Sequence, residues 1–356
     1  MFETRLTRLR KFMEEKDIPA FLVNSAVNRA YLSGFAGTAG TLLVVPEEAV
    51  LFVDFRYTEQ AKEQAPHCRI VEHGLDVKKE IYEYLHSHGI RRIFFEKDHV
   101  TYGAYLEYKK AWQGIELCAA DGLPERLREI KDEHELEIMR EAAKLADEAY
   151  EHILGIIRPG MSEREVALEL EWFMRKRGAA STSFDTIVAS GERSALPHGT
   201  ASDRKLGPNE FVTMDFGAYY KGYCSDLTRT IVLGKASQRH REIYEIVLEA
   251  QMYALERIRP GMSGKEADAL ARRIIEKYGY GDRFGHSTGH GLGMEIHEAP
   301  RLSQRSETVL EPGMVVTVEP GIYIPGFGGV RIEDDVVITE TGAQRLTLSA
   351  KDLVEL

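Results

Sequence analysis

Two short phrases in the sequence each place an acid at the end of an apolar strand pattern. "VTMDFG" (212–217) contains Asp215, and "VTVEPG" (316–321) contains Glu319 at the corresponding position. Burying a carboxylate among apolar side chains is costly unless a cation meets it. Because the same costly choice is made twice, we expect the two acids to act together.

Each phrase is followed by a turn and a returning strand pattern that contains a second acid. Since side chains alternate between the two faces of a strand, Asp215 and Asp226 are predicted to share the polar face of one hairpin. Glu319 and Glu333 share the polar face of the other hairpin in the same way. Four converging carboxylates would repel one another, and two divalent cations would balance their charge. For any single acid, the alternative is an ordinary surface residue at a hairpin edge.

Histidines in unusual loops extend this set of possible ligands. They are His198 in "ALPHGT" and His286, His290 and His297 in "GHSTGHGLGMEIHEAP". Glycine-rich segments disfavour a helix and suit a tight loop around a small ligand. Imidazole combined with carboxylates is typical of Mn, Fe, Co or Zn sites and not of thiolate sites. Cys224, two residues before Asp226, is interpreted as a small core residue.

The elements that must position these residues are predicted from an internal repeat. "IRPGMSERE" starts at Ile157 and "IRPGMSGKE" at Ile258, and each contains a Ser-x-x-Glu capping box that begins a helix. The phrases "LGPNEFVTMDFG" (206–217) and "LEPGMVVTVEPG" (310–321) recur in the same order at nearly the same offset. We therefore expect a duplicated α+β unit with pseudo-twofold halves, in which helices pack on an antiparallel sheet.

The first third of the chain has a different pattern, in which short strand-like runs alternate with helical segments. This alternation predicts an α/β domain over residues 1–125, followed by a second domain over 126–356. Residues 123–154 have one long charged helical pattern, which is predicted to lead from one domain into the other. "GFAGTAGT" (34–41) lacks the lysine of a phosphate-binding loop and is interpreted as a turn.

Composition excludes several classes of protein. The net charge of −11 argues against a nucleic-acid partner, which would need a basic face. Three widely spaced cysteines form neither a disulfide framework nor a CxxC zinc pattern. No run approaches the roughly 20 apolar residues of a membrane span. We expect a cytoplasmic protein with no membrane partner.

With these residues assembled, the second domain resembles the metallopeptidase family of Xaa-Pro aminopeptidases, prolidases and methionine aminopeptidases, which has the pita-bread fold. The resemblance implies a dinuclear centre whose five ligands are Asp215, Asp226, His290, Glu319 and Glu333. In that set Asp226 and Glu333 bridge the two ions, Asp215 chelates one ion, and His290 and Glu319 hold the other. It also implies two divalent ions per chain, with manganese preferred and cobalt, zinc or iron as alternatives.

The first domain narrows the class. "NRAYLSGF" (28–35) and "LFVDFRYTEQA" (51–61) resemble N-terminal segments of the creatinase type. Prolidases and aminopeptidases P carry this domain, whereas methionine aminopeptidases are usually close to the catalytic domain alone. Creatinase and the non-catalytic peptide-binding relatives lack the metal ligands, so the intact ligand set counts against both.

The implied reaction is hydrolysis of the Xaa-Pro bond at a peptide N-terminus by a hydroxide that bridges the metals. Glu319 would be both ligand and catalytic base. The resemblance assigns substrate binding and stabilisation of the tetrahedral intermediate to His198 and His297, and a supporting role to His286. Arg331 would either orient Glu333, which we favour, or bind a substrate carboxylate.

Two alternatives for the substrate stay open. The compact length favours an Xaa-Pro dipeptidase (prolidase), and an aminopeptidase P that acts on longer peptides is the alternative. A methionine aminopeptidase-like enzyme or a non-catalytic peptide-binding scaffold is favoured less. The resemblance also implies a homodimer.

Overall fold

The computed structural model describes residues 1–356, which divide into two compact units, Met1–Arg128 and Glu129–Leu356. The sequence placed this boundary between residues 125 and 126. No helix in either unit combines the length and the apolar character needed to cross a membrane.

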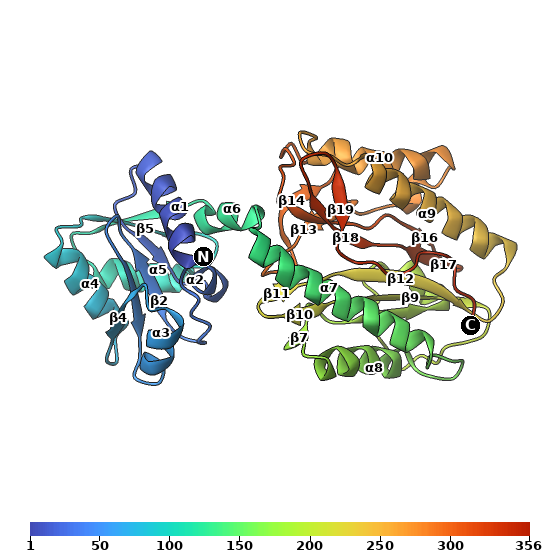
Figure 1. Ribbon diagram of the computed structural model, residues 1–356, viewed down its shortest axis with the longest axis horizontal. Coiled ribbons are helices and arrows are strands. Elements are labelled where there is room, and N and C mark those ends of the chain that lie inside the picture. Colours follow the sequence, from blue (N-terminus) through green and yellow to red (C-terminus); the bar gives the residue numbers. More distant parts are fainter. The chain divides into compact units, whose positions relative to one another are not determined.

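The first unit is an α/β domain built on a six-stranded sheet in the order β4-β3-β2-β1-β5-β6 (Figure 1). The strands are β1 (Phe21–Val23), β2 (Thr41–Val44), β3 (Ala49–Val53), β4 (Arg69–Glu72), β5 (Arg92–Glu96) and β6 (Glu116–Ala120). The helices are α1 (Phe2–Glu15), α2 (Ala26–Ser33), α3 (Thr58–Gln64), α4 (Val77–Ser87) and α5 (Tyr102–Ala111). β1 pairs with β2, and β2 with β3, in antiparallel fashion, whereas the pairs β3–β4, β1–β5 and β5–β6 are parallel.

Helix α2 was not predicted from the strand and helix periodicity. Its N-cap is Ser25, whose side chain accepts a hydrogen bond from the Asn28 backbone N–H, and it ends at Gly34. Gly34 has a φ of 78°, a left-handed conformation that glycine adopts without steric cost. Both signals are short-range, and they decide the ends of a helix that is too short to show strong periodicity.

The predicted single helix over residues 123–154 is wrong, because the segment forms two helices, α6 (Leu123–Glu129) and α7 (Glu133–Leu154). Between them Ile130 forms an isolated β-bridge with Met314, which takes the backbone out of helical conformation. Asp132 then caps α7, with Glu135 completing a reciprocal capping box. The break is thus produced by a strand-like contact with a residue far away in the sequence.

The second unit consists of two halves with the same order of elements. In the first half, α7, α8 (Glu163–Lys176), β7 (Ser181–Thr182) and β8 (Ile187–Ser190) precede β9 (Glu210–Phe216), β10 (Ala218–Tyr220), β11 (Tyr223–Cys224) and β12 (Leu227–Leu233). In the second half, α9 (Gln238–Arg257), α10 (Gly264–Lys277), β13 (Gly289–Gly291) and β14 (Glu298–Leu302) precede β15 (Val315–Val318), β16 (Gly321–Ile324), β17 (Gly328–Arg331), β18 (Asp334–Ile338) and β19 (Ala343–Arg345). Short 3₁₀ helices occupy Gly191–Ala195 and Gly281–Arg283.

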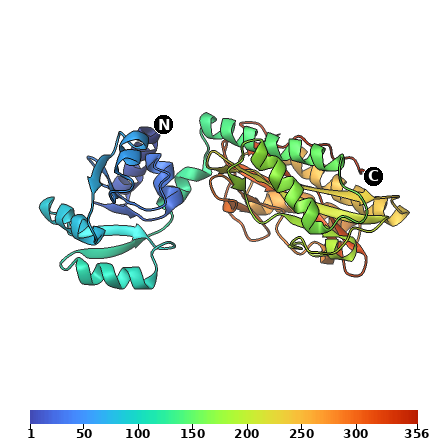
Figure 2. The same ribbon diagram turned by 90° about the horizontal axis from the view of Figure 1, so that it is seen from below.

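The antiparallel strands form the predicted α+β architecture, divided mainly into a sheet β12-β9-β8 and a sheet β14-β13-β15-β18-β19. Helices α7 and α8 run beside the strands of the first half, and α9 and α10 beside those of the second (Figures 1 and 2). Both predicted capping boxes, Ser162 with Glu165 and Ser263 with Glu266, are present, each worth about 1 kcal/mol.

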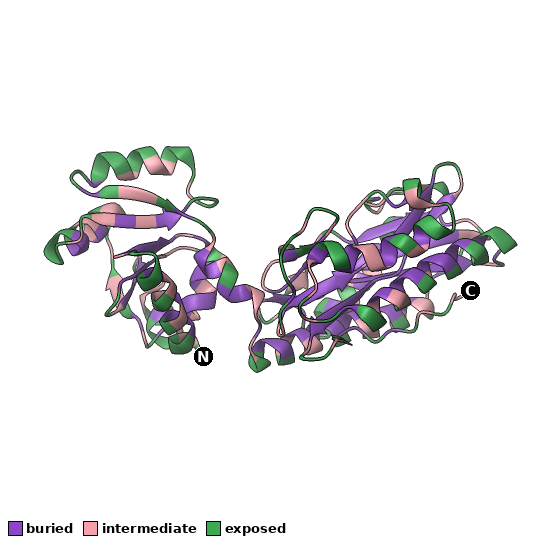
Figure 3. Ribbon diagram, turned by 90° about the horizontal axis from the view of Figure 1, so that it is seen from above, coloured by how far each residue is buried: buried purple, intermediate pink, exposed green.

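Each half has its own apolar core. In the first half, Val212, Met214 and Phe216 of β9 are fully buried against α7 and α8. In the second, Val316 and Val318 of β15 pack with α9 and α10. Figure 3 shows that the strands of this unit are largely buried. With these apolar side chains directed to the helices, the alternate residues of β9 and β15 face the opposite side of the strands.

Candidate active site

The predicted acids and His290 converge in one cavity. Asp215 lies near the end of β9, Asp226 just before β12, Glu319 just after β15, and Glu333 between β17 and β18. These four carboxylates and His290 all line a cavity of about 480 Å³ in the second unit. Duplicated strand ends therefore bring together residues that lie far apart in the sequence.

Distances within the cavity are those of a ligand cluster. His290 Nε2 lies 3.7 Å from Asp226 Oδ2 and 3.6 Å from Glu319 Oε1. One donor atom each from Asp226, His290 and Glu333 lies within 4.8 Å of the others, which allows one ion to contact all three. The Oδ1 atoms of Asp215 and Asp226 are buried and have no hydrogen-bond partner. These orphaned oxygens and the mixed carboxylate–imidazole donor set fit divalent metal ions.

Burial and mutual repulsion perturb the acids strongly. Desolvation, followed by the neighbouring carboxylates, raises the pKa of Asp226 and Glu333 well above the ordinary value. Burial raises the pKa of Glu319 to about 8. Without cations the cluster therefore retains protons near neutral pH, and cations would displace them.

This proton retention predicts how the stability of the metal-free chain depends on pH. Because the pKa of Glu319 rises from 4.5 to about 8 on folding, the folded state holds more protons between those values. The free energy of unfolding should therefore fall as pH rises from about 5 to about 8. Urea unfolding of chelator-treated protein across this range tests the slope, with Glu319→Gln expected to flatten it. A free energy of unfolding that rises over the same interval would contradict the prediction.

His290 is held in the tautomer that a metal ligand needs. Its Nδ1 donates to the Gly291 carbonyl at 3.0 Å, so the lone pair of Nε2 points toward Asp226 and Glu319. Burial lowers the pKa of His290 to about 3, which keeps the ring neutral. A neutral imidazole fixed by a backbone acceptor is the usual state of a ligating histidine.

The sequence favoured Glu333 as the carboxylate that Arg331 orients, and this prediction is wrong. Arg331 Nη2 donates to Asp215 Oδ2 at 2.5 Å and not to Glu333, which instead accepts from the Thr228 hydroxyl. Packing between the halves explains the difference, because β17 lies against β9, the strand of the other half that carries Asp215. Arg331 is buried and therefore positions a carboxylate of the cavity, although that carboxylate is Asp215.

A hydrogen-bonded chain continues from Arg331 to His286. Arg331 Nη1 donates to the Tyr323 hydroxyl at 2.9 Å, and that hydroxyl lies 2.8 Å from His286 Nε2. His286 Nδ1 donates to the Ser287 carbonyl, so Nε2 accepts from Tyr323. Burial lowers the pKa of His286 to about 4, so the ring is neutral. Through Tyr323, His286 is thus connected to Arg331, which holds Asp215.

The structure brings His198 and His297 to the same cavity. The ring of His297 lies edge-on to that of His290, with 4.5 Å between the centroids. His198 is exposed at the cavity, where a substrate can reach it. Their assignment to substrate binding and intermediate stabilisation stays a prediction.

Cys224 is buried, and burial raises the pKa of its thiol to about 12. Its Sγ atom is directed to the Met294 carbonyl at 3.9 Å. This is the environment of the small core residue that the sequence predicted.

Sequence reasoning missed several residues of the site. Phe184 and Ile296 supply apolar surface to the cavity, and Arg301 is a cation in its lining. Arg301 belongs to β14 and lies opposite His290 in the ladder. No local pattern identifies it, because its place in the cavity depends on pairing between β13 and β14.

Asp335 was also missed as part of the support for the site. One of its carboxylate oxygens accepts from the Asp226 backbone N–H at 2.8 Å, and the other is buried without a partner. Burial raises the pKa of Asp335 well above its ordinary value. Its position as the third acid of "IEDD" (332–335), on the predicted strand face of Glu333, was the sequence signal for it. Asp335 holds the backbone from which Asp226 enters the cavity.

Comparison with known proteins agrees with this geometry. Residues 137–340 match the model of metallopeptidase family M24, and residues 5–130 match the creatinase/prolidase N-terminal domain. The chain is 46% identical to an Xaa-Pro dipeptidase of Pyrococcus furiosus, over 98% of this chain and 99% of the relative. Its structure resembles that of an Xaa-Pro dipeptidase from Bacillus anthracis, with a TM-score of 0.98, 52% identity and full coverage of both chains. It also resembles an X-Pro aminopeptidase from Thermotoga maritima, with a TM-score of 0.92, 38% identity and coverage of 97% and 100%.

Proposed function

We propose that this chain, which belongs to metallopeptidase family M24 and carries a creatinase/prolidase N-terminal domain, hydrolyses the Xaa-Pro bond of dipeptides. One observation carries the proposal: four carboxylates and a neutral imidazole share a cavity with the cation Arg301. The donors fit two divalent ions, and the cation fits the carboxylate of a dipeptide. Similarity to proteins named Xaa-Pro dipeptidase supports the same substrate class.

The five predicted ligands would hold the ions. These ligands are Asp215, Asp226, His290, Glu319 and Glu333, which line the same cavity. When bound, divalent ions supply Lewis acidity, which polarises a carbonyl group and makes a water molecule more acidic. We propose manganese as the working ion, with cobalt, zinc and iron as alternatives. The bridging-hydroxide mechanism expected from the resemblance stays part of this proposal.

The protein's own residues would move the proton and hold the substrate. Glu319 would accept the proton of the attacking water and pass it to the leaving nitrogen, as a carboxylate placed within reach of both groups can do. His297 and His198 would donate hydrogen bonds to the carbonyl oxygen as it gains charge. Arg331 and Asp335 would keep Asp215 and Asp226 in position.

The test is an assay of the full-length chain with three substrates. We expect Ala-Pro to be cleaved faster than an Xaa-Pro-Pro tripeptide or a longer Xaa-Pro peptide. Chelation should abolish cleavage, and added Mn²⁺ or Co²⁺ should restore it. Faster cleavage of the longer peptides would favour the aminopeptidase P alternative. Structural similarity to the X-Pro aminopeptidase from Thermotoga maritima supports that alternative. A folded chain that binds no metal and cleaves none of the three would favour a non-catalytic scaffold.

Substitution of Arg301 should affect the cleavage of short and long substrates differently. Arg331 is already bound to Asp215, so Arg301 is the guanidinium in the cavity that can bind a substrate carboxylate. Arg301→Met should lower kcat/KM for Ala-Pro by about 10- to 100-fold, because a hydrogen bond to a charged group is lost. The loss should be several-fold smaller for a longer peptide, whose carboxylate lies elsewhere.

The control is Arg305→Met, since Arg305 is an exposed arginine close in sequence that does not line the cavity. An equal loss for short and long substrates would contradict the role of Arg301 in recognising the carboxylate.

We also propose that the protein works as a homodimer in the cytoplasm. Sedimentation of the full chain would test its oligomeric state.

A further inference from the structure

A second group of metal-type ligands lies in the first unit, outside the cavity described above. Glu96 ends β5, His99 follows in the next turn, and Glu125 is in the first turn of α6. One donor atom from each of the three lies within 4.8 Å of the others. His99 Nε2 lies 3.5 Å from Glu125 Oε1. The three donors are therefore close enough to contact a single ion.

Two further observations point to a bound ion. A small cavity of about 10 Å³ lies between these side chains, which is on the order of the space for one water or one ion. Glu125 Oε2 is buried and has no hydrogen-bond partner. A buried carboxylate oxygen without a donor is costly, and a cation in the adjacent cavity would satisfy it.

The two carboxylates are held in place before any ion binds. Glu96 is only 4% exposed, and its Oε2 accepts the backbone N–H groups of Asn24 and Ser25 at 2.6 and 2.8 Å. The Asn28 amide donates to Glu96 Oε1 at 2.7 Å and to Glu125 Oε1 at 2.6 Å. Arg128 in turn donates to Asn28 Oδ1, which fixes the orientation of the amide. Such fixed acceptors reduce the cost of ordering ligands around an ion.

A purely structural role explains only part of this arrangement. Without any ion, Glu96 already accepts the backbone N–H groups of Asn24 and Ser25 just before α2. A positively charged His99 would pair with Glu125. That pairing uses Glu125 Oε1 and leaves Oε2 without a partner beside the small cavity. Nearby Lys97 does not supply the missing donor, because it is paired with Asp121.

We propose that Glu96, His99 and Glu125 bind one Zn²⁺ ion, with water completing the coordination. Two carboxylates and one imidazole form a donor set that zinc accepts in four-coordinate sites. The ion would join the end of β5 to the start of α6 and so hold α6 against the sheet of the first unit. This site is separate from the reaction in the second unit and does not depend on the proposed peptidase activity.

The test is a Zn²⁺ titration of the metal-free full-length chain by calorimetry. Asp226→Asn with Glu333→Gln is introduced first, to weaken binding in the other cavity. We expect one equivalent of Zn²⁺ to bind, and the addition of His99→Ala to weaken it by at least about tenfold. Hydrogen exchange in α6 should slow when Zn²⁺ is added to the background chain, and should not change in the His99→Ala chain.

The matched control is His86→Ala, which removes an exposed histidine of the same unit that lies outside the cluster. Equal binding with and without His99, or an equal effect of His86→Ala, would overturn the proposal. If the background variant does not fold, zinc is counted by elemental analysis in the otherwise unmodified chain after gel filtration. The His99→Ala protein should then contain one ion fewer per chain, and equal contents would overturn the proposal.

Discussion

Glu319→Gln should reduce kcat for an Xaa-Pro dipeptide by at least about a thousandfold, because the substitution removes both a negative metal ligand and the proposed base. Glutamine has nearly the same shape and preserves an acceptor for the Thr317 hydroxyl, which lies 3.2 Å from Glu319 Oε1. The packing around the site should therefore survive. The loss would come from charge and proton transfer.

Steady-state assays of manganese-loaded protein measure this effect, and metal content is measured in parallel. A loss of rate with unchanged metal content would assign the effect to proton transfer, whereas loss of one ion would assign it to ligation. Glu311→Gln is the control, since Glu311 is exposed just before β15 and should keep the original rate. A Glu319→Gln rate within tenfold of the unmodified chain would refute both roles.

The second large effect concerns stability. Asp334 is fully buried between Glu333 and Asp335, and it pairs with Arg229 at 2.8 Å and with Lys351 at 2.8 Å. Although burial opposes the ionised form, these cations hold the pKa of Asp334 below its ordinary value. Gln251 of α9 donates to the same carboxylate. One acid thus connects a helix, two strands and the C-terminal segment.

Asp334→Ala should lower the free energy of unfolding of the second unit by about 3–5 kcal/mol, because it leaves the fully buried Arg229 guanidinium uncompensated. Urea unfolding with hydrogen exchange in β12 and β18 reads this unit by itself. A loss below about 1 kcal/mol would show that the backbone carbonyl acceptors of the guanidinium, at Thr228, Glu333, Ser349 and Ala350, are sufficient to satisfy it.

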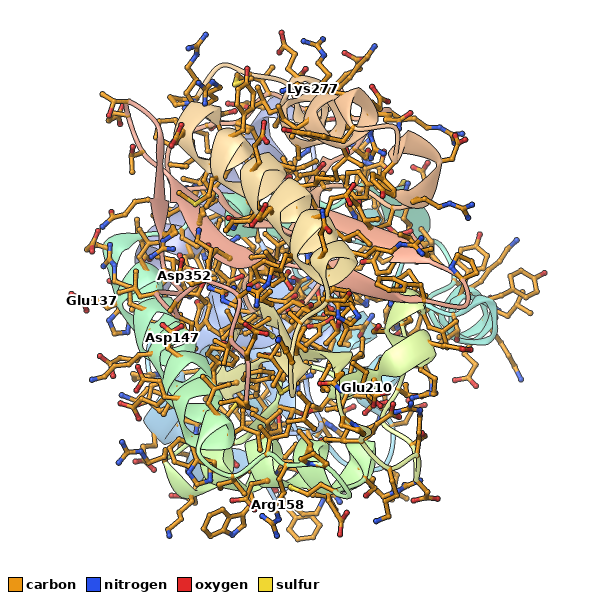
Figure 4. All side chains as sticks on the ribbon, turned by 90° about the vertical axis from the view of Figure 1, so that its right-hand side faces the viewer. Glu137, Asp147, Arg158, Glu210, Lys277 and Asp352 are labelled. Carbon is orange, nitrogen blue, oxygen red and sulfur yellow. The ribbon has the colours of Figure 1, made fainter.

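The matched control is Asp352→Ala, which removes the same charge from an exposed position in the same C-terminal segment. Figure 4 shows Asp352 on the face that also displays Asp147 of α7. Asp147 accepts the backbone N–H groups of Leu348 and Ser349, so this segment stays attached in the control. A change of no more than about 0.5 kcal/mol is expected for Asp352→Ala.

Local sequence patterns were sufficient to predict the elements that recur in the two halves of the second unit. The Ser-x-x-Glu boxes at Ser162 and Ser263 mark helix starts because their hydrogen bonds span only three residues. The helix break at Ile130 was not predictable in this way. It depends on a bridge to Met314, and no propensity of the intervening residues encodes that contact.

The residues of the candidate site also differ in whether local sequence patterns could predict them. Strand alternation and the internal repeat were enough to group Asp215, Asp226, Glu319 and Glu333, because the period of two fixes which side chains share a face. Assignment of His290 as a ligand needed the family resemblance as well. The structure places all five in one cavity, and their roles as ligands await the experiments above.

Only the tertiary structure decided which charges meet. Alternation along the sequence places Arg331 on the predicted face of Glu333, yet Arg331 donates to Asp215 of the other half. Arg301 enters the cavity through its place opposite His290, and Glu125 approaches Glu96 through the Asn28 amide. The physical reason is range: backbone geometry repeats within a few residues, whereas contacts between strands depend on register and packing across the whole fold. The sequence by itself therefore determined that acids would gather at the strand ends of a duplicated unit, and the fold determined the partner of each.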